Sequence, residues 1–322
     1  MNTVHGHQEG TTVGYNPRYH GRGSYQPLIA FEGNSKAAIH AELRSGSSPS
    51  GNEIVDFYKQ AKQNLPDGVQ LGYVRADRGF SADEFLCQLE SDEVDYVIKI
   101  RSTSHVKRRQ SEGILWNRIY MDDTRAIEVG SVNCRLSTWD KHRRLVFIRK
   151  TEYVNHGQLR LFDLWDYQVI VTNLDWSPEE IWHFYNQRAT CENYIKELKY
   201  GLNIDTISKG TFLANAADLW LKVISYNTIL AMKNYFPQEY KTYSISRIQR
   251  VLLQIPALVV KHARRLTLRM PSWWPYSHFW QAVKTCFLLC EIDIKLSSWC
   301  YDPVKIVATN LILHRNPTGI GI

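Results

Sequence analysis

The spacing of apolar residues predicts that strands and helices alternate over the first hundred residues. Two apolar runs, 26–32 and 36–43, are separated by a Gly-Asn-Ser turn and predict a β-hairpin. Helical spacing follows over 52–65, and two further strands are predicted at 71–76 and 94–100. Strands that alternate with helices in this way are typical of an α/β fold.

Two shorter features belong to the same region. Residues 5–24 are rich in glycine, asparagine and charge, so an extended loop is expected there. A helix is predicted to begin with Ser81 as its N-cap, because Glu84 stands three residues further on, as in a capping box.

The pattern changes after residue 100. Short β-like runs recur between 101 and 175, at 126–132, 144–149 and 164–172, and they predict a β insertion. Ser177 followed by Pro178 marks a helix start. Two long helices separated by 201–210 fit the pattern up to residue 235. Further helices are predicted at 245–268 and 278–289.

The composition is that of a basic globular protein. With 322 residues, 44% of them hydrophobic, the chain can bury one large core or two moderate ones. Its 39 lysines and arginines against 32 acidic residues give a net charge of +7, which favours a polyanionic partner without identifying it. The six cysteines lack metal-ligand spacing, and residues 1–30 lack a signal-peptide pattern. We therefore expect reduced thiols in a cytoplasm, and no membrane helix.

Four polar residues of the helical segment after Ser177 fall on one face. Tyr185, Arg188, Glu192 and Lys199 recur at intervals of three, four and seven residues. On a single helix they occupy a stripe roughly 60° wide. This stripe borders an apolar one, so Glu192 is expected at the edge of the core. From the pattern alone, an ordinary i,i+4 ion pair between Arg188 and Glu192 is the commoner explanation.

A second informative carboxylate ends a predicted strand. Asp77 follows the strand at 71–76 and precedes a glycine-containing turn, and strand ends are where sites form in open α/β sheets. Considered alone, it is better explained as a turn-forming aspartate. Together with Glu192, however, it could bind Mg²⁺, because carboxylates from distant elements can converge on a divalent cation.

These motifs resemble those of a known family. Tyr185-x2-Arg188-x3-Glu192-x6-Lys199 matches the Tyr-Arg-Glu-Lys signature of cut-and-paste insertion-sequence transposases with an Asp-Asp-Glu triad. RADRGFSADEF, around Asp77, resembles their second-aspartate motif, and the resemblance extends to about residue 270. It implies a ribonuclease-H-like mixed sheet with flanking helices, a β insertion between the second aspartate and the glutamate, and a helical C-terminal extension.

The resemblance also implies an organisation and an activity. It divides the chain into the first part of a catalytic domain, a β insertion, the helices that carry the glutamate, and the extension, at 1–100, 101–175, 176–235 and 236–322. The implied activity is DNA cleavage and strand transfer with Mg²⁺ or Mn²⁺. Asp77 and Glu192 would be catalytic metal ligands, and Tyr185, Arg188 and Lys199 would contact DNA. The implied partners are double-stranded DNA and a second subunit, as a homodimer on DNA in the bacterial cytoplasm and nucleoid.

One departure leaves alternatives open. The first aspartate of the family would lie a few residues before Thr3, so we expect an N-terminally truncated chain whose own activity is in question. The alternative is a catalytically inactive remnant that only binds DNA or a partner subunit. A nuclease or resolvase of the same fold is a third hypothesis, which Tyr185 and Lys199 disfavour.

Three basic clusters could follow DNA phosphates, although solvated surface is an equally good explanation. They lie at 107–109, 141–144 and 261–265. The last cluster is predicted to be helical, and we favour its residues Lys261, Arg264 and Arg265 as DNA contacts.

Overall fold

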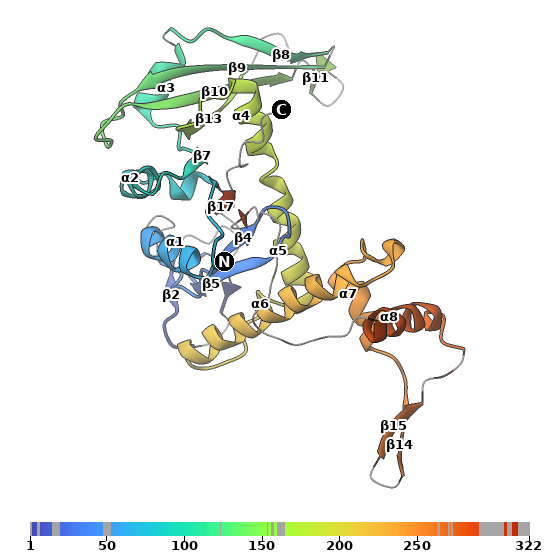
Figure 1. Cartoon of the computed structure of the whole chain (residues 1–322). Coiled ribbons are helices and arrows are strands. Elements are labelled where there is room, and N and C mark those ends of the chain that lie inside the picture. Colours follow the sequence, from blue (N-terminus) through green and yellow to red (C-terminus); the bar gives the residue numbers. More distant parts are fainter. Residues whose placement is uncertain are drawn as a thin grey trace.

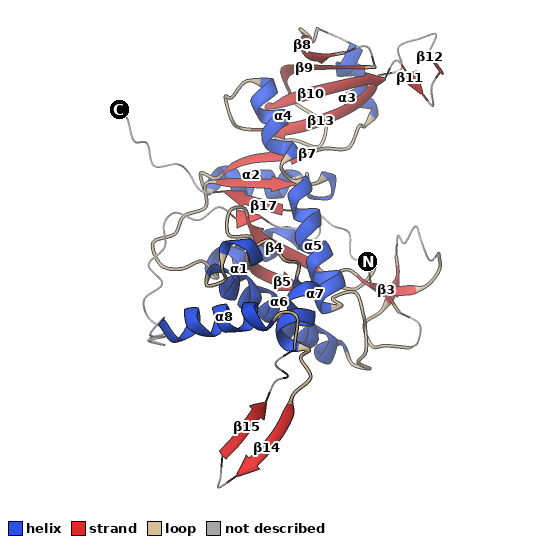
Figure 2. Cartoon of the chain, turned by 90° about the vertical axis from the view of Figure 1, so that its right-hand side faces the viewer, coloured by secondary structure: helices blue, strands red, loops and turns tan. Residues whose placement is uncertain are grey.

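A computed structural model gives the fold of the chain. It describes residues 2–4, 7–14, 20–47, 53–111, 113–122, 124–152, 154–155, 158–159, 165–262, 265–269, 271, 273–289, 306–307 and 311–314. The architecture is a mixed α/β sheet with flanking helices (Figures 1 and 2).

Ten strands form the main sheet, in the order β5, β4, β16, β17, β6, β7, β13, β10, β9 and β8. Their bounds in chain order are β4 (Leu28–Glu32), β5 (Ala38–Glu42), β6 (Tyr73–Ala76), β7 (Asp95–Lys99), β8 (Asn117–Met121), β9 (Arg125–Cys134), β10 (Arg143–Glu152), β13 (Asp166–Thr172), β16 (Ile306–Val307) and β17 (Leu311–His314). The pairs β6–β7 and β4–β17 are parallel, and the other pairs are antiparallel. The sheet is therefore continuous from the first strands into the predicted insertion.

Helices cover both faces of this sheet. On one face, α1 (Ile54–Gln63) and α2 (Asp83–Ser91) share a core cluster with β4, β6 and β7. On the other face, α5 (Ala189–Leu202) and α6 (Phe212–Asn234) pack against β4 and β5, and α4 (Pro178–Asn186) packs against β9, β10 and β13. Figure 1 shows α1 and α2 on one side of the sheet and α4 and α5 on the other.

Because the strands are pleated, the sheet contributes side chains to two hydrophobic cores. In β4, Leu28 and Ala30 pack toward α1 and α2, whereas Ile29 and Phe31 pack toward α5 and α6. Strands that are buried on both faces appear as continuous apolar runs, as this one does. The predicted hairpin is confirmed, since β4 and β5 pair antiparallel.

The smaller elements correct several predictions. The expected loop at 5–24 contains β2 (Thr12–Val13) and reaches β3 (Gly23–Tyr25), which pairs with β2 and with β1 (Asn2–Thr3). The region expected to be a β insertion also contains a helix, α3 (Ser104–Ser111), and a short hairpin of β11 (Val154–Asn155) and β12 (Gln158–Leu159).

The capping box predicted at Ser81 is wrong. The chain first forms η1 (Arg78–Phe80), and α2 begins after Ala82, which makes no side-chain cap. Ser81 instead donates its hydroxyl to the Arg78 carbonyl at 3.3 Å. Because η1 occupies the residues between Asp77 and Ser81, α2 begins only after Ser81.

The C-terminal region is less helical than predicted. The predicted helix at 245–268 continues only through α7 (Ile245–Ile248) and the π-helical turn η3 (Gln249–Leu253). Pro256 cannot donate a helical hydrogen bond, and the β-branched Val259 and Val260 favour a strand. A hairpin of β14 (Leu258–His262) and β15 (Arg265–Arg269) follows and projects from the body (Figure 2).

Two further elements complete the described chain. The short η2 (Gln238–Tyr240) follows α6, and α8 (Ser277–Leu289) confirms the helix predicted at 278–289. Strands β16 and β17 join the main sheet and correct the expectation of a wholly helical extension. Within the described residues, no helix is both long and apolar enough to cross a membrane.

Candidate active site where β6 meets α4 and α5

Asp77 stands at the end of β6, where the chain turns into η1. Its side chain accepts a hydrogen bond from the Arg78 N–H at 2.8 Å. Because strand residues alternate between faces, Asp77 continues the face of Arg75 rather than that of Val74 and Ala76, which pack toward α1 and α2. This is the face covered by α4 and α5.

Arg75 ties this strand to the end of α4. Its side chain is buried, and Nη1 donates to the Phe184 carbonyl and, at 3.4 Å, to Gln187 Oε1. Its Cζ lies 4.8 Å from the centre of the Phe184 ring. Burial lowers the pKa of Arg75 to about 10, so the group is charged at neutral pH. Arg75 was not among the predicted site residues, although a cation inside an apolar strand is an available signal.

The four signature residues span two helices, which corrects the prediction of one continuous helix. Tyr185 belongs to α4, Glu192 and Lys199 belong to α5, and Arg188 is the N-cap residue between them. Arg188 N–H bonds to the Tyr185 carbonyl at 2.8 Å, and Cys191 N–H bonds to the Arg188 carbonyl at 2.9 Å. These three-residue hydrogen bonds tighten the chain and separate the helices.

Arg188 interacts electrostatically with both predicted carboxylates. Its Nη2 is 3.5 Å from Glu192 Oε1, and its Cζ is 5.9 Å from the Tyr185 ring centre. Burial lowers the pKa of Arg188, but Tyr185, Asp77 and Glu192 outweigh that effect and raise it. Asp77 and Glu192, which are 115 positions apart in the sequence, therefore act on one guanidinium.

The exposure of these groups differs from the prediction. The Glu192 side chain is 56% exposed rather than at the edge of the core, while that of Arg188 is 19% exposed. Tyr185 is buried, and burial raises the pKa of its hydroxyl although Arg188 opposes the shift. The site thus combines the largely buried Arg188 and Tyr185 with the exposed carboxylate of Glu192.

The remaining predicted DNA contacts lie elsewhere. Lys199 is half-buried, two helical turns beyond Glu192 on α5 and about 10 Å further along the axis. Lys261 and Arg265 lie on the projecting hairpin rather than on a helix, well away from β6 (Figure 1). Arg264 lies outside the described residues.

A basic cavity of about 470 Å³, which the sequence did not predict, is lined in part by Arg78, the residue after Asp77. Its lining comprises Arg78, Lys99, Ile100, Arg101, Ser102, Asp166, Tyr167, Gln168 and Val169. Three cations there face one carboxylate, so the cavity favours an anion. The available signal was the placement of Arg78 two residues after β6, and of Lys99 and Arg101 at and two residues after the end of β7.

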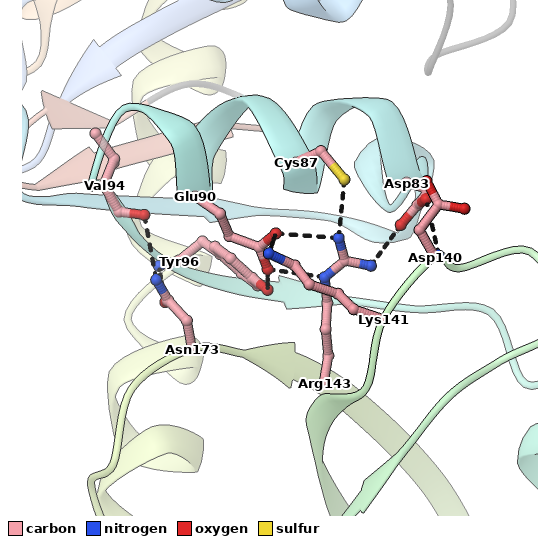
Figure 3. A network of polar contacts seen from close by, with 9 residues as sticks. All are labelled: Asp83, Cys87, Glu90, Val94, Tyr96, Asp140, Lys141, Arg143 and Asn173. Carbon is pink, nitrogen blue, oxygen red and sulfur yellow. Dashed lines mark hydrogen bonds and ion pairs between the residues drawn. The ribbon is translucent and has the colours of Figure 1, made fainter.

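The basic residues of the cluster at 141–144 make ion pairs and hydrogen bonds within the protein. Lys141 pairs with Glu90 at 2.8 Å, and the buried Arg143 pairs with Asp83 and Glu90 of α2 (Figure 3). Arg144 donates to two backbone carbonyls, those of 174 and 176. Lys141 and Arg143 of this cluster therefore join β10 and the residue before it but one to α2. In the cluster at 107–109, Lys107 and Arg108 are exposed on α3.

A third acidic group is not found with Asp77 and Glu192 in the part of the chain that the structure describes. No three His, Cys, Asp or Glu side chains among those residues lie close enough to hold a metal ion. The sheet position between β4 and β6 holds β16 and β17, with Leu311 opposite Ala76. Cys87, Cys134 and Cys191 are free thiols.

A mixed α/β sheet with a carboxylate at a strand end and another on a covering helix is compatible with a ribonuclease-H-like fold. The family comparison is more specific. The chain matches the family Transposase DDE domain group 1 over residues 1–288, and it therefore belongs to this family of DDE transposases. A search of curated proteins gave no match.

Proposed function

We propose that this chain is a DNA transposase that acts by metal-dependent DNA cleavage and strand transfer, as an insertion-sequence enzyme. The observation that carries the proposal is that the carboxylates of Asp77 and Glu192 both act on the Arg188 guanidinium, in a chain of the DDE family. The Tyr-Arg-Glu-Lys signature supports the more specific assignment, because it supplies an arginine, a lysine and a tyrosine suited to phosphates and bases.

Asp77 and Glu192 are the residues that would hold Mg²⁺ or Mn²⁺. Their carboxylate oxygens are the hard ligands that these ions prefer, and the exposed Glu192 can reach an incoming ion. When bound, such an ion polarises a phosphodiester oxygen and stabilises the charge that develops during displacement. Arg188, charged and mostly buried beside both carboxylates, would orient them and bind a DNA phosphate.

The basic cavity that Arg78 helps to line supports a nucleic-acid substrate. Arg78, Lys99 and Arg101 place three positive charges within reach of a phosphate backbone that approaches the carboxylates. Tyr167 in the same lining offers an aromatic ring to an unpaired base. We infer that this cavity guides one DNA strand to the site, and that two copies act together on paired ends.

A second candidate function is DNA binding without catalysis. It is favoured by the absence of a third carboxylate beside Asp77 and Glu192 among the residues that the structure describes. In that case the basic surfaces would be retained, and the chain would bind DNA or an active subunit.

The test uses a labelled duplex that carries the terminal sequences flanking the coding region of the chain, with Mg²⁺ present. Nicks with 3′-hydroxyl ends and joining to a target plasmid are expected. Asp77→Asn and Glu192→Gln should each lower the rate at least about 100-fold, since each removes a metal ligand. Glu179→Gln, an exposed carboxylate on α4, is the matched control and should retain activity. Isothermal titration with Mn²⁺ should show weaker binding in the two site variants only.

Salt dependence tests the DNA binding that both candidate functions require, and cleavage separates the two. Arg101→Gln should lower the slope of log K against log salt by about 1, because one phosphate contact is lost. Lys59→Gln, exposed on α1, should leave the slope unchanged. Binding with this pattern but without cleavage would establish the second candidate, whereas neither binding nor cleavage would refute both.

A further inference from the structure

Arg75 is a buried cation whose hydrogen-bond partners carry no charge. It lies on β6, and its side chain is among the largest that are fully buried in the described chain. Its Nη1 donates to the Phe184 carbonyl and, at 3.4 Å, to Gln187 Oε1, whereas its Nε is buried without a hydrogen-bond partner among the described residues. Burial lowers its pKa to about 10. An arginine held in this way costs the folded state stability, so its presence needs another explanation.

The Phe184 carbonyl is the acceptor that a continuous helix would offer to the Arg188 N–H, because an α-helical N–H bonds to the carbonyl four residues earlier. Here Arg75 binds that carbonyl, and the Arg188 N–H bonds instead to the Tyr185 carbonyl at 2.8 Å. The N–H groups of residues 190 and 191 also bond to carbonyls three residues earlier, at 3.1 and 2.9 Å. The guanidinium of Arg75 therefore lies at the point where α4 ends and α5 begins.

We propose that Arg75 is a positioning residue for the metal-dependent reaction, an inference that rests on the proposed function. By binding the Phe184 carbonyl, Arg75 ends α4 just before Arg188. It thereby sets how α5 presents Glu192, whose carboxylate acts on Arg188 together with that of Asp77. Since Asp77 follows Arg75 by two residues, the end of β6 supplies one carboxylate and fixes the helix that carries the other. Arg75 itself is too deeply buried to contact DNA.

Helix geometry sets the size of the effect. A three-residue turn winds the chain by about 120° per residue, against about 100° in an α-helix. Three successive bonds of this kind turn α5 by roughly 60° more than a continuous helix would. At a side-chain radius of about 5 Å, this rotation moves a carboxylate by roughly 5 Å. A misplacement of about 1 Å can already cost about 100-fold in rate, so a continuous helix would disable the site.

Arg143 provides a matched control, because it is a buried arginine with charged partners. Burial lowers the pKa of Arg143, but hydrogen bonds to Glu90 and Asp83 outweigh this effect and raise it. The two arginines therefore affect stability in opposite directions at pH 7. In urea unfolding, Arg75→Met should keep or raise the midpoint, whereas Arg143→Met should lower it. Equal losses in the two variants would make Arg75 a stabilising residue and overturn the proposal.

Nuclear magnetic resonance detects the helix break without metal or DNA. Isotopic labelling of glutamine carbonyls and arginine nitrogens selects the amides of Arg188 and Arg250, since only these arginines follow a glutamine. Arg75→Met should shift the Arg188 signal, because the Arg188 N–H then bonds to the Phe184 carbonyl. The Arg250 signal should stay unchanged, and Arg143→Met should shift neither. An unshifted Arg188 signal in Arg75→Met would contradict the role of Arg75 in ending α4.

Metal binding and kinetics test the consequence for the reaction. Arg75→Met should weaken Mn²⁺ binding in isothermal titration at least about 10-fold. It should also lower kcat for cleavage of the labelled duplex at least about 100-fold and leave KM unchanged. Arg75→Lys should fall between, since an ammonium can donate to the Phe184 carbonyl but lacks the planar fork. Arg143→Met, measured below its unfolding transition, should retain both Mn²⁺ binding and kcat.

A double substitution separates positioning from a general loss of structure. In the Glu192→Gln chain, Arg75→Met should cause little further loss of Mn²⁺ affinity, because both changes act through one carboxylate. Additive losses, or native kinetics in Arg75→Met, would overturn the proposal. A native chain that neither binds Mn²⁺ nor cleaves DNA would instead refute the proposed function, and the Arg188 signal would then decide whether Arg75 ends α4.

Discussion

Replacing Arg143 with methionine should weaken the contact between β10 and α2. Arg143 lies on β10, its side chain is 2% exposed, and it pairs with Asp83 and Glu90 of α2 (Figure 3). Its Nε is 2.8 Å from Glu90 Oε1, and its Cζ is 5.2 Å from the Trp139 ring centre. Methionine keeps an unbranched apolar stem but removes the charge and every one of these donors.

The expected cost follows from the partners that remain. Loss of one partner from a buried ion pair costs about 3–5 kcal/mol. Glu90 keeps Lys141 at 2.8 Å and Tyr96 at 2.7 Å, whereas Asp83 keeps the Asp140 N–H at 3.3 Å. The surviving contacts reduce the penalty on Glu90 more than that on Asp83. We therefore expect a loss of about 2–4 kcal/mol in the free energy of unfolding.

Urea unfolding at pH 7 measures this loss. The control is Arg125→Met, which removes an exposed arginine of the same sheet, 3.7 Å from Asp122, and should leave the transition unchanged within error. A loss below about 1 kcal/mol for Arg143→Met would refute the reasoning, because that is the range of an exposed pair.

The loss of stability in the same variant should depend on pH. Burial raises the pKa of Glu90, but hydrogen bonds from Arg143, Lys141 and Tyr96 outweigh it and lower the pKa to about 2. A carboxyl with a lowered folded pKa stabilises the protein above its unfolded pKa of about 4.3, and this stability is lost as pH falls toward 2. The difference in the free energy of unfolding between the native chain and Arg143→Met should therefore shrink as the pH falls from about 4.5 to 2. A difference independent of pH would contradict the assignment.

Two further substitutions have matched controls. In Gly201→Ala the new Cβ would lie 2.6 Å from the Ile245 side chain, so stability should fall by about 1–3 kcal/mol although alanine favours a helix. Gly210→Ala meets open space and should cost little, and equal effects in urea unfolding would contradict this account. Ser177→Ala should cost about 1 kcal/mol in the same assay, because Ser177 caps α4. Ser81→Ala should be near neutral, and a comparable loss there would restore the discarded capping box.

The sequence predicts those elements whose signals are local. The hairpin of β4 and β5, the helix α1 and the strands β6 and β7 follow from apolar spacing within about ten residues. Ser177 and Pro178 likewise mark the start of α4, where the capping box is formed by nearest neighbours. In these segments the burial of each residue agrees with the periodicity, and no distant contact competes with it.

Features that depend on distant contacts could not be predicted in this way. The break between α4 and α5 coincides with the bonds from Arg75, which is 109 residues away from Phe184 in the sequence. The buried state of Arg143 depends on carboxylates of α2, and from sequence it could only be grouped with a basic cluster. Asp77 and Glu192 were singled out by their places at a strand end and on a helix face and given catalytic roles by the family resemblance, whereas the cavity that Arg78 helps to line requires β6, β7 and β13 to be placed first.

The contacts of Arg75 explain why Arg188 is the cation that interacts with Asp77 and Glu192. A buried guanidinium needs compensation, and a nearby aspartate would ordinarily supply it. Arg75 instead binds the Phe184 carbonyl, in the last turn of α4, where unpaired carbonyls carry partial negative charge. The Phe184 ring and Gln187 amide complete its shell. Asp77, two residues further along the chain, is thereby left to act on Arg188, as the proposed site for a metal ion and a phosphate requires.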